Sequence, residues 1–113
     1  MSRMAVRFEE VEFDPVAGEL LRGTVRTRLE PQPARVLALL VERAGEVVTR
    51  EELQQRVWTD DTFVDFERGL NYCMAQIRAA LGDSASQPRF VETLPRRGYR
   101  FIAAIQGPAP GLA

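Results

Sequence analysis

The sequence predicts an α+β fold, with an N-terminal four-stranded antiparallel sheet, then three helices, then a C-terminal β-hairpin. Residues 6–29 contain short, partly alternating apolar segments separated by turn residues. Three segments between residues 31 and 81 repeat apolar residues at helical spacing, separated by a short extended link at Val47-Val48 and a loop at residues 59–66. Residues 89–103 hold two β-rich runs around a turn. The 113 residues, 45% of them hydrophobic and 27% charged, are enough for one domain with a single core.

Four short strands are expected in the N-terminal sheet, because each segment is rich in strand-forming residues and is bounded by turn formers. The turns contain Asp14-Pro15 with Gly18, and then Gly23. We expect one face of this sheet to pack and the other to face water. The four segments are Val6–Phe8, Val11–Phe13, Glu19–Arg22 and Val25–Leu29.

Proline, a capping motif and glycine delimit the first two helices. Pro31 and Pro33 lie at the entry to the first helix, where proline is tolerated, and Gly45 ends it. Thr49 and Glu52 are three residues apart and form a capping box at the start of the second helix. The side chains expected to face the core are Val36, Leu37, Leu40 and Val41 in the first helix, and Leu53, Val57 and Trp58 in the second.

The third helix and the hairpin complete the expected order. Asp65 can cap a helix that Gly82 ends. The side of this helix that faces the core is formed by Leu70, Cys73, Met74, Ile77 and Leu81. The second and third helices then form a helix-turn-helix pair, and the hairpin around Pro95–Gly98 is its wing. We expect the domain to span residues 1–105, and residues 106–113, rich in proline and glycine, to be a flexible tail or linker to a downstream region.

Composition narrows the class of protein. The sequence has no histidine, no clustered cysteines and no glycine-rich phosphate loop, so we expect no catalytic residues, metal, cofactor or small-molecule substrate, and no enzyme activity. The single cysteine, the absence of an apolar run of about 18–20 residues and the absence of a secretory signal fit the cytoplasm. A membrane anchor downstream of these residues stays open.

Charge gives a mixed indication of nucleic-acid binding. The net charge of −1 argues against a general attraction to nucleic acid. All 15 basic residues are arginine, whose planar guanidinium suits phosphate and guanine recognition. A GC-rich genome would produce the same bias, so the position of the arginines matters more than their number.

One face of the third helix offers side chains that could read DNA. On a helical wheel, Arg68 and Tyr72 lie opposite the apolar side, with Asn71 and Gln76 flanking them. Arginine, asparagine and glutamine hydrogen-bond to base edges in the major groove. Arg78 lies nearer the buried edge and completes the candidate set. The alternative is the solvated face of an ordinary amphipathic helix.

The hairpin gives a stronger indication. Arg89, Arg96, Arg97 and Arg100 lie between residues 89 and 100, against Glu92 as the one acidic residue. Arginines at a tight turn project positive charge away from the body, which suits phosphate or minor-groove contacts. The alternative is protection of a sheet edge by charge.

Three other features have both a structural and a functional interpretation. Trp58 either fills the core or directs its indole N–H at a phosphate. Cys73 is expected to be a small core residue. Asp60 and Asp61 are interpreted as part of a solvated acidic loop rather than a metal site or an acid–base pair.

Several stretches resemble the OmpR/PhoB-type winged-helix domain, especially the branch found at the N-termini of one-component regulators of the CadC and ToxR type. The similarity covers roughly residues 6–104 and is strongest in the ending Val91–Phe101. The other matching stretches are Gly45–Leu53, Val57-Trp58 and Val64–Phe66. The resemblance implies sequence-specific binding of double-stranded DNA as a transcriptional regulator domain. It places the recognition helix, residues 67–81, in the major groove and the wing, residues 95–98, at the neighbouring minor groove.

The resemblance also implies roles for individual residues. The residues matching DNA-contacting positions of the family are Arg50, Trp58, Arg68, Tyr72, Gln76, Thr93, Arg96 and Arg97. The loop that touches RNA polymerase in the family corresponds to Asp60, Asp61, Thr62 and Phe63. Because one such domain is small, we expect a dimer or a tandem arrangement on DNA.

The third helix departs from the family pattern at one place. Relatives usually carry two basic residues in its middle, where this chain has Ala75 and Gln76. Each lost bidentate contact removes about 1–3 kcal/mol of base discrimination. The alternative function is therefore a winged-helix module that has lost DNA binding and docks a protein.

Overall fold

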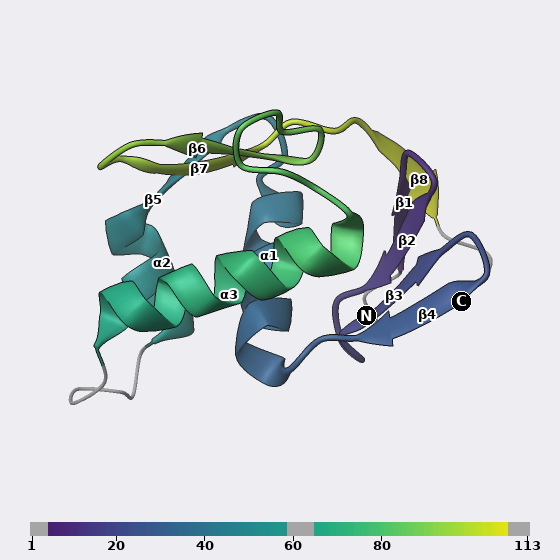
Figure 1. Ribbon diagram of the computed structural model, residues 1–113, viewed down its shortest axis with the longest axis horizontal. Coiled ribbons are helices and arrows are strands. Elements are labelled where there is room, and N and C mark those ends of the chain that lie inside the picture. Colours follow the sequence, from purple (N-terminus) through teal and green to yellow (C-terminus); the bar gives the residue numbers. More distant parts are fainter. Residues whose placement is uncertain (1–4, 59–64, 109–113) are drawn as a thin grey trace.

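The computed structural model describes residues 5–58 and 65–108 and confirms the predicted mixed α+β winged-helix architecture (Figure 1). The chain forms strands before, between and after three helices. In order, the elements are β1 (Val6–Phe8), β2 (Val11–Asp14), β3 (Glu19–Arg22), β4 (Val25–Arg28), α1 (Pro31–Glu42), β5 (Val47–Thr49), α2 (Arg50–Val57), α3 (Phe66–Leu81), β6 (Val91–Leu94), β7 (Gly98–Phe101) and β8 (Ile105–Pro108).

The N-terminal sheet has five strands rather than the four expected. Its order is β4-β3-β2-β1-β8, and its neighbouring strands are antiparallel. Strand β8 pairs with β1 through Val6↔Pro108 and Arg7↔Gly107, so the expected flexible tail begins with residues that belong to this sheet. The pairing satisfies backbone groups of β1 that would otherwise lie at an open sheet edge. The remaining tail residues, 109–113, lie outside the described part of the chain.

A second sheet builds the wing, with the order β5-β7-β6. The short extended segment before α2 is β5, and it pairs with β7 through Val48↔Tyr99 and Thr49↔Gly98. Gly98 is required by this close approach, because a Cβ there would overlap the carbonyl oxygen of Val48 and lie 2.9 Å from Cα of Thr49. The wing is therefore attached directly to the residues that lead into α2.

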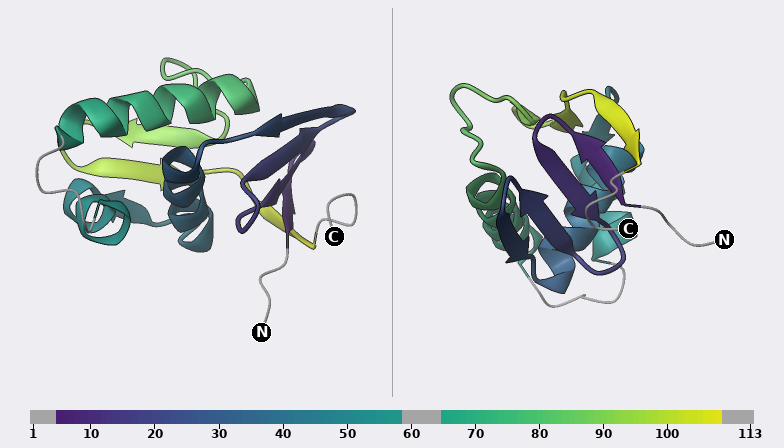
Figure 2. Two further views of the ribbon diagram at one scale, coloured as in Figure 1. Left: turned by 90° about the horizontal axis from the view of Figure 1, so that it is seen from below. Right: turned by 90° about the vertical axis from the view of Figure 1, so that its right-hand side faces the viewer.

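The core lies between the two sheets and the three helices. The predicted inner residues of α3 are all buried, as are Leu53, Val57 and Trp58 at α2. Phe8 of β1 joins the two sheets, because its ring centroid lies 4.8 Å from that of Phe101 and 5.8 Å from that of Phe90. Helix α3 forms an outer layer of the molecule, so one of its faces packs and the other is directed away (Figure 2). In residues 5–58 and 65–108, no helix has both the length and the apolar character needed to cross a membrane.

Candidate nucleic-acid interface

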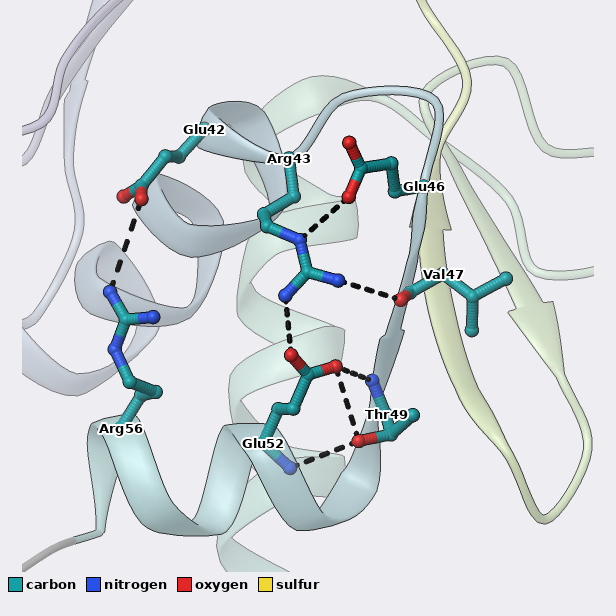
Figure 3. Close-up of polar contacts among 7 residues, drawn as sticks. All are labelled: Glu42, Arg43, Glu46, Val47, Thr49, Glu52 and Arg56. Carbon is teal, nitrogen blue, oxygen red and sulfur yellow. Dashed lines mark hydrogen bonds and ion pairs between the residues drawn. The ribbon is translucent and has the colours of Figure 1, made fainter.

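A polar cluster fixes the corner at which α2 begins (Figure 3). The predicted capping box is present: the Glu52 N–H donates to Thr49 Oγ1 at 3.1 Å, and the Thr49 N–H donates to Glu52 Oε1 at 3.0 Å. The Arg43 guanidinium donates to Glu52 Oε2 at 2.5 Å and to Glu46 Oε1 at 2.9 Å. The backbone bond from Thr49, and then the contact with Arg43, hold the pKa of Glu52 below its ordinary value.

Arg50, the first residue of α2, connects α2 to both α3 and the wing. Its backbone N–H donates to the carbonyl oxygen of Arg97 at 3.0 Å. Its guanidinium pairs with the Glu67 carboxylate and lies 5.9 Å from the centre of the Phe66 ring. Arg50 thus lies at the predicted contact surface, but Glu67 of α3 neutralises its charge.

The caps of α3 set which side of the helix faces outward. Asp65 accepts a bond from the Arg68 N–H at 3.3 Å, and Gly82 ends the helix with a left-handed φ of 71°, both as predicted. The outward sector predicted from the sequence is exposed. Its members are Arg68, Asn71, Tyr72, Ala75, Gln76 and Ala79.

Tyr72 is exposed but already has a partner. Its hydroxyl donates to Glu30 Oε2 at 2.9 Å, and Glu30 is the residue before α1. This bond to a carboxylate is the main reason that the pKa of Tyr72 lies above its ordinary value. The phenol therefore stays protonated and can donate a hydrogen bond to a phosphate only after it releases Glu30.

Arg78 lies differently from the other α3 candidates. One guanidinium nitrogen donates to the Val91 carbonyl oxygen at 3.1 Å and to Thr93 Oγ1 at 2.8 Å, and its Nε is buried. The side chain thus joins α3 to β6 and supports the wing rather than the outward face of the helix. Thr93 is exposed and accepts this bond, which leaves its own hydroxyl proton available to donate.

The wing turn presents two arginines. The Arg97 N–H donates to the Leu94 carbonyl oxygen at 3.0 Å, which closes a four-residue turn with Pro95 in its second position. Arg96 occupies the third position with φ 67°, a left-handed conformation uncommon for a side chain of this kind. Both Arg96 and Arg97 are exposed.

The other two arginines of the hairpin are neutralised. Arg100 donates to Glu92 Oε1 at 2.6 and 2.9 Å across the strand pair. Arg89 lies 3.4 Å from Glu10 and 3.7 Å from Glu9, which belong to the turn between β1 and β2. The expectation of four arginines against Glu92 alone was incomplete, because carboxylates far away in the sequence fold against Arg89. The positive charge of the wing is therefore concentrated at its tip.

Trp58 occupies the core, which favours the first of its two interpretations. Its ring is 4% exposed and packs edge to face on Phe66, with ring centroids 5.0 Å apart. A Cβ on Gly69 of α3 would lie 3.2 Å from the indole ring, so glycine allows the two helices this contact. The indole nitrogen is buried without a hydrogen-bond partner among the described residues, so it faces protein rather than the outer surface.

An open groove of about 500 Å³ lies where α2, α3 and the wing meet. It is lined by Thr49, Arg50, Glu51, Gln54, Phe66, Glu67, Arg96 and Arg97. Glu67 and Glu30, which pair with Arg50 and Tyr72, could not be identified from the sequence, because each lies on a different element from its partner. The predicted polymerase-contact residues Asp60, Asp61, Thr62 and Phe63 lie outside the described residues.

Residues 24–101 match the family described as "Transcriptional regulatory protein, C terminal". The chain is 33% identical over 116 residues to the cholera toxin homolog transcriptional activator of Vibrio parahaemolyticus, covering 97% of this chain and 40% of that protein. It is also 33% identical over 97 residues to the KDP operon transcriptional regulatory protein KdpE of Escherichia coli, covering 86% of this chain and 43% of that protein. The chain thus spans less than half the length of these curated relatives.

Solved structures show the same fold. The DNA-binding domain of E. coli CadC superposes with a TM-score of 0.74 at 22% identity, covering 95% of this chain and 99% of that one. The DNA-binding domain of Klebsiella pneumoniae RstA, solved in complex with the RstA box, gives 0.73 at 23% identity, covering 88% of this chain and 98% of that one. The response regulator DrrB of Thermotoga maritima gives 0.75 at 28% identity, covering 89% of this chain and 45% of that one.

Proposed function

Because the chain belongs to the OmpR/PhoB-type family of transcriptional regulatory protein C-terminal domains, we propose that it binds double-stranded DNA, with α3 in the major groove and the β6–β7 wing at the adjacent minor groove. The observation that carries this proposal is the position of the arginines that have no carboxylate partner. Among the described residues, the arginines with no Asp or Glu oxygen within 4.0 Å are Arg22, Arg28, Arg35, Arg68, Arg78, Arg96 and Arg97. All but Arg35 lie on α3, on the wing or on the β3–β4 hairpin.

The exposed face of α3 supplies the groups for base reading. Arg68, Asn71 and Gln76 are exposed and carry the donors and acceptors that bind base edges. A helix of 16 residues is about 24 Å long, and the major groove admits a helix of ordinary diameter. We assign base recognition to these three side chains.

Contacts with the sugar-phosphate backbone come from the flanking elements. Arg96 and Arg97 project from the wing, and Thr93 has a hydroxyl proton to donate. Arg50 and Tyr72 add contacts once phosphate competes with their carboxylate partners, Glu67 and Glu30. Arg78 acts indirectly, by holding Thr93 and β6 against α3.

The first experiment is selection of bound duplexes from a random library, followed by gel-shift titrations at low and moderate salt. Replacing both Arg96 and Arg97 by alanine should weaken binding to every duplex and reduce the slope of log K against log salt by about 2. Arg68→Ala and Gln76→Ala should instead change which bases are preferred. The matched control is the double variant Arg26→Ala/Arg56→Ala, which loses two arginines that already pair with Glu19 and Glu42.

Two outcomes separate this function from a protein-docking module. A folded parent protein that binds no duplex even at low salt would favour the docking module, whose surface would still include α3. A wing double variant that binds as tightly as the parent would show that the wing assignment is wrong.

The finer partners are part of the same proposal. A single α3 reads only a few base pairs, so we propose that two copies bind repeated half-sites, about 10 base pairs apart from centre to centre. The stoichiometry on duplexes with one or two half-sites tests this. We also propose RNA polymerase as the partner of residues 60–63, which transcription in vitro with alanine variants of that loop would test.

A further inference from the structure

A second groove lies beside the C-terminal half of α3, on the side away from the wing. Its lining includes Arg22 of β3, Arg28 of β4, and Gln76, Ala79 and Ala80 of α3, and its volume is about 230 Å³. Strand β4 is the edge of its sheet and runs next to the end of α3 (Figures 1 and 2). Gln76 belongs both to this groove and to the outward face of α3, so the groove continues the proposed DNA interface.

The groove carries positive charge that is not neutralised. Its lining contains two arginines and no acidic residue. Within the described part of the chain, neither Arg22 nor Arg28 has a carboxylate oxygen within 4.0 Å. The other described arginines of the same sheet are paired, Arg7 with Glu12 at 3.7 Å and Arg26 with Glu19 at 3.4 Å.

Arg22 is directed at the end of α3. A Cβ on Gly82, the C-cap of that helix, would overlap the Arg22 guanidinium, with its Cζ 3.2 Å away. The backbone carbonyls at a helix C-terminus favour a nearby cation, which keeps the Arg22 side chain extended from β3 toward α3. The cation is thus held at the edge of the helix face that we place against DNA.

Helix α3 itself has no cation between Arg68 and Arg78, and Arg78 is committed to Val91 and Thr93. The exposed positions in its second half are Ala75, Gln76 and Ala79, none of which carries a charge. A DNA strand along this part of α3 would therefore have no charged partner on the helix. A basic groove next to these positions supplies the missing charge.

We propose that Arg22 and Arg28 each bind a backbone phosphate of the duplex, in the groove between the β3–β4 hairpin and the C-terminal half of α3. This inference rests on the proposed function. The domain then contacts the backbone on both sides of the major groove, through the wing on one side and the β3–β4 hairpin on the other. The small side chains of Ala79 and Ala80 let the sugar-phosphate chain approach the groove.

The test compares double variants by fluorescence anisotropy with a duplex obtained from the library selection. Arg22→Gln/Arg28→Gln removes the two free charges, and Arg26→Gln/Arg56→Gln is the control, with the same charge change at paired arginines. Each phosphate contact contributes about 0.9 to the slope of log K against log salt. The slope of the Arg22→Gln/Arg28→Gln variant should therefore be about 1.8 shallower than that of the parent. Over a fourfold rise in salt, the affinity of the parent should fall about 12-fold more than that of the Arg22→Gln/Arg28→Gln variant.

Charge-preserving variants separate binding from folding. Arg22→Lys/Arg28→Lys should retain the parent slope, because counterion release depends on charge, and circular dichroism should show the same fold for every variant. The inference is overturned if the parent binds the duplex, the wing variant flattens the slope, and the Arg22→Gln/Arg28→Gln variant behaves like the control. That result leaves the proposed function standing, whereas a parent that binds no duplex overturns both.

Discussion

Glu67→Gln is expected to tighten DNA binding and, at the same time, to lower the stability of the domain. Glu67 lies in the first turn of α3, and its carboxylate pairs with the guanidinium of Arg50. The Glu67 side chain is 63% exposed and that of Arg50 is 25% exposed, so the pair lies at the surface of the groove between α2, α3 and the wing. The substitution removes an anion and frees a cation where we place phosphate.

The two effects have opposite signs and different sizes. The folded state loses an exposed ion pair and a favourable charge at a helix N-terminus, so the free energy of unfolding should fall by roughly 1 kcal/mol. In the parent complex the Glu67 anion offsets the charge that Arg50 offers to phosphate, so removing this anion should steepen the slope of log K against log salt by about 0.9. A fourfold decrease in salt should therefore raise the affinity of the variant about 3.5-fold more than it raises that of the parent.

Anisotropy titrations across a salt series, together with urea denaturation, measure both quantities on the same samples. Glu42→Gln is the matched control, because it makes the same charge change at an α1 carboxylate that lies 4.0 Å from Arg56, away from α3 (Figure 3). The control should leave the slope unchanged. A Glu67→Gln protein whose affinity and slope equal those of the control would refute the idea that Glu67 masks a DNA-binding cation.

Three further predictions concern the supporting structure. The pKa of Glu52 is lowered, so its contribution to stability is present above its ordinary pKa near 4.5 and is lost as the pH falls below that value. In urea denaturation, the Glu52→Gln variant should therefore lose less stability than the parent when the pH falls from about 7 to about 3. Burial raises the pKa of Cys73 from 9.0 to about 11, so its thiolate fraction at neutral pH is about 100-fold below that of the unfolded chain. Reaction of Cys73 with a disulfide reagent should therefore be much slower in the native protein, and equal rates in native and urea-unfolded protein would contradict its burial. Gly98→Ala should lower the free energy of unfolding by about 1–3 kcal/mol and weaken DNA binding, because its Cβ meets the Val48 carbonyl; an unchanged urea midpoint would count against this packing.

Local sequence signals predicted the helices and most strands well. The capping box at Thr49, the cap at Asp65 and the stop at Gly82 are interactions within a few residues of one another, so the sequence alone defines them. The strand Val6–Phe8 was also predicted with the observed bounds. Alternation and turn residues determine such elements before any tertiary contact forms.

Long-range pairings were not predictable in the same way. Strand β8 contains Gly107 and Pro108, which favour a linker when considered alone, and it becomes a strand because β1 offers it an unpaired edge. The link Val47-Val48 was expected to be extended, but the strand that pairs with it, β7, lies about 50 residues later in the chain. Neither pairing has a signature within its own segment.

The site was predictable in its outline but not in its internal contacts. The helical period alone correctly identified the exposed side of α3. It could not show that Arg78 is turned toward Thr93, or that Arg50 is neutralised by Glu67, because those contacts depend on how the helices and the wing pack. The burial of Trp58 agrees with its interpretation as a core residue, and its indole ring lies against Gly69 of α3.

The proposed function requires that the outward face of α3 and the tip of the wing together contact DNA. The most direct measurement is an NMR titration of the ¹⁵N-labelled domain with a selected duplex, followed by mapping of the amide shift changes onto the fold. We expect the largest changes at the exposed positions of α3 between Arg68 and Ala79 and at residues 93–97 of the wing. Largest changes along β1 and β8, or a spectrum that the duplex leaves unchanged at low salt, would contradict it.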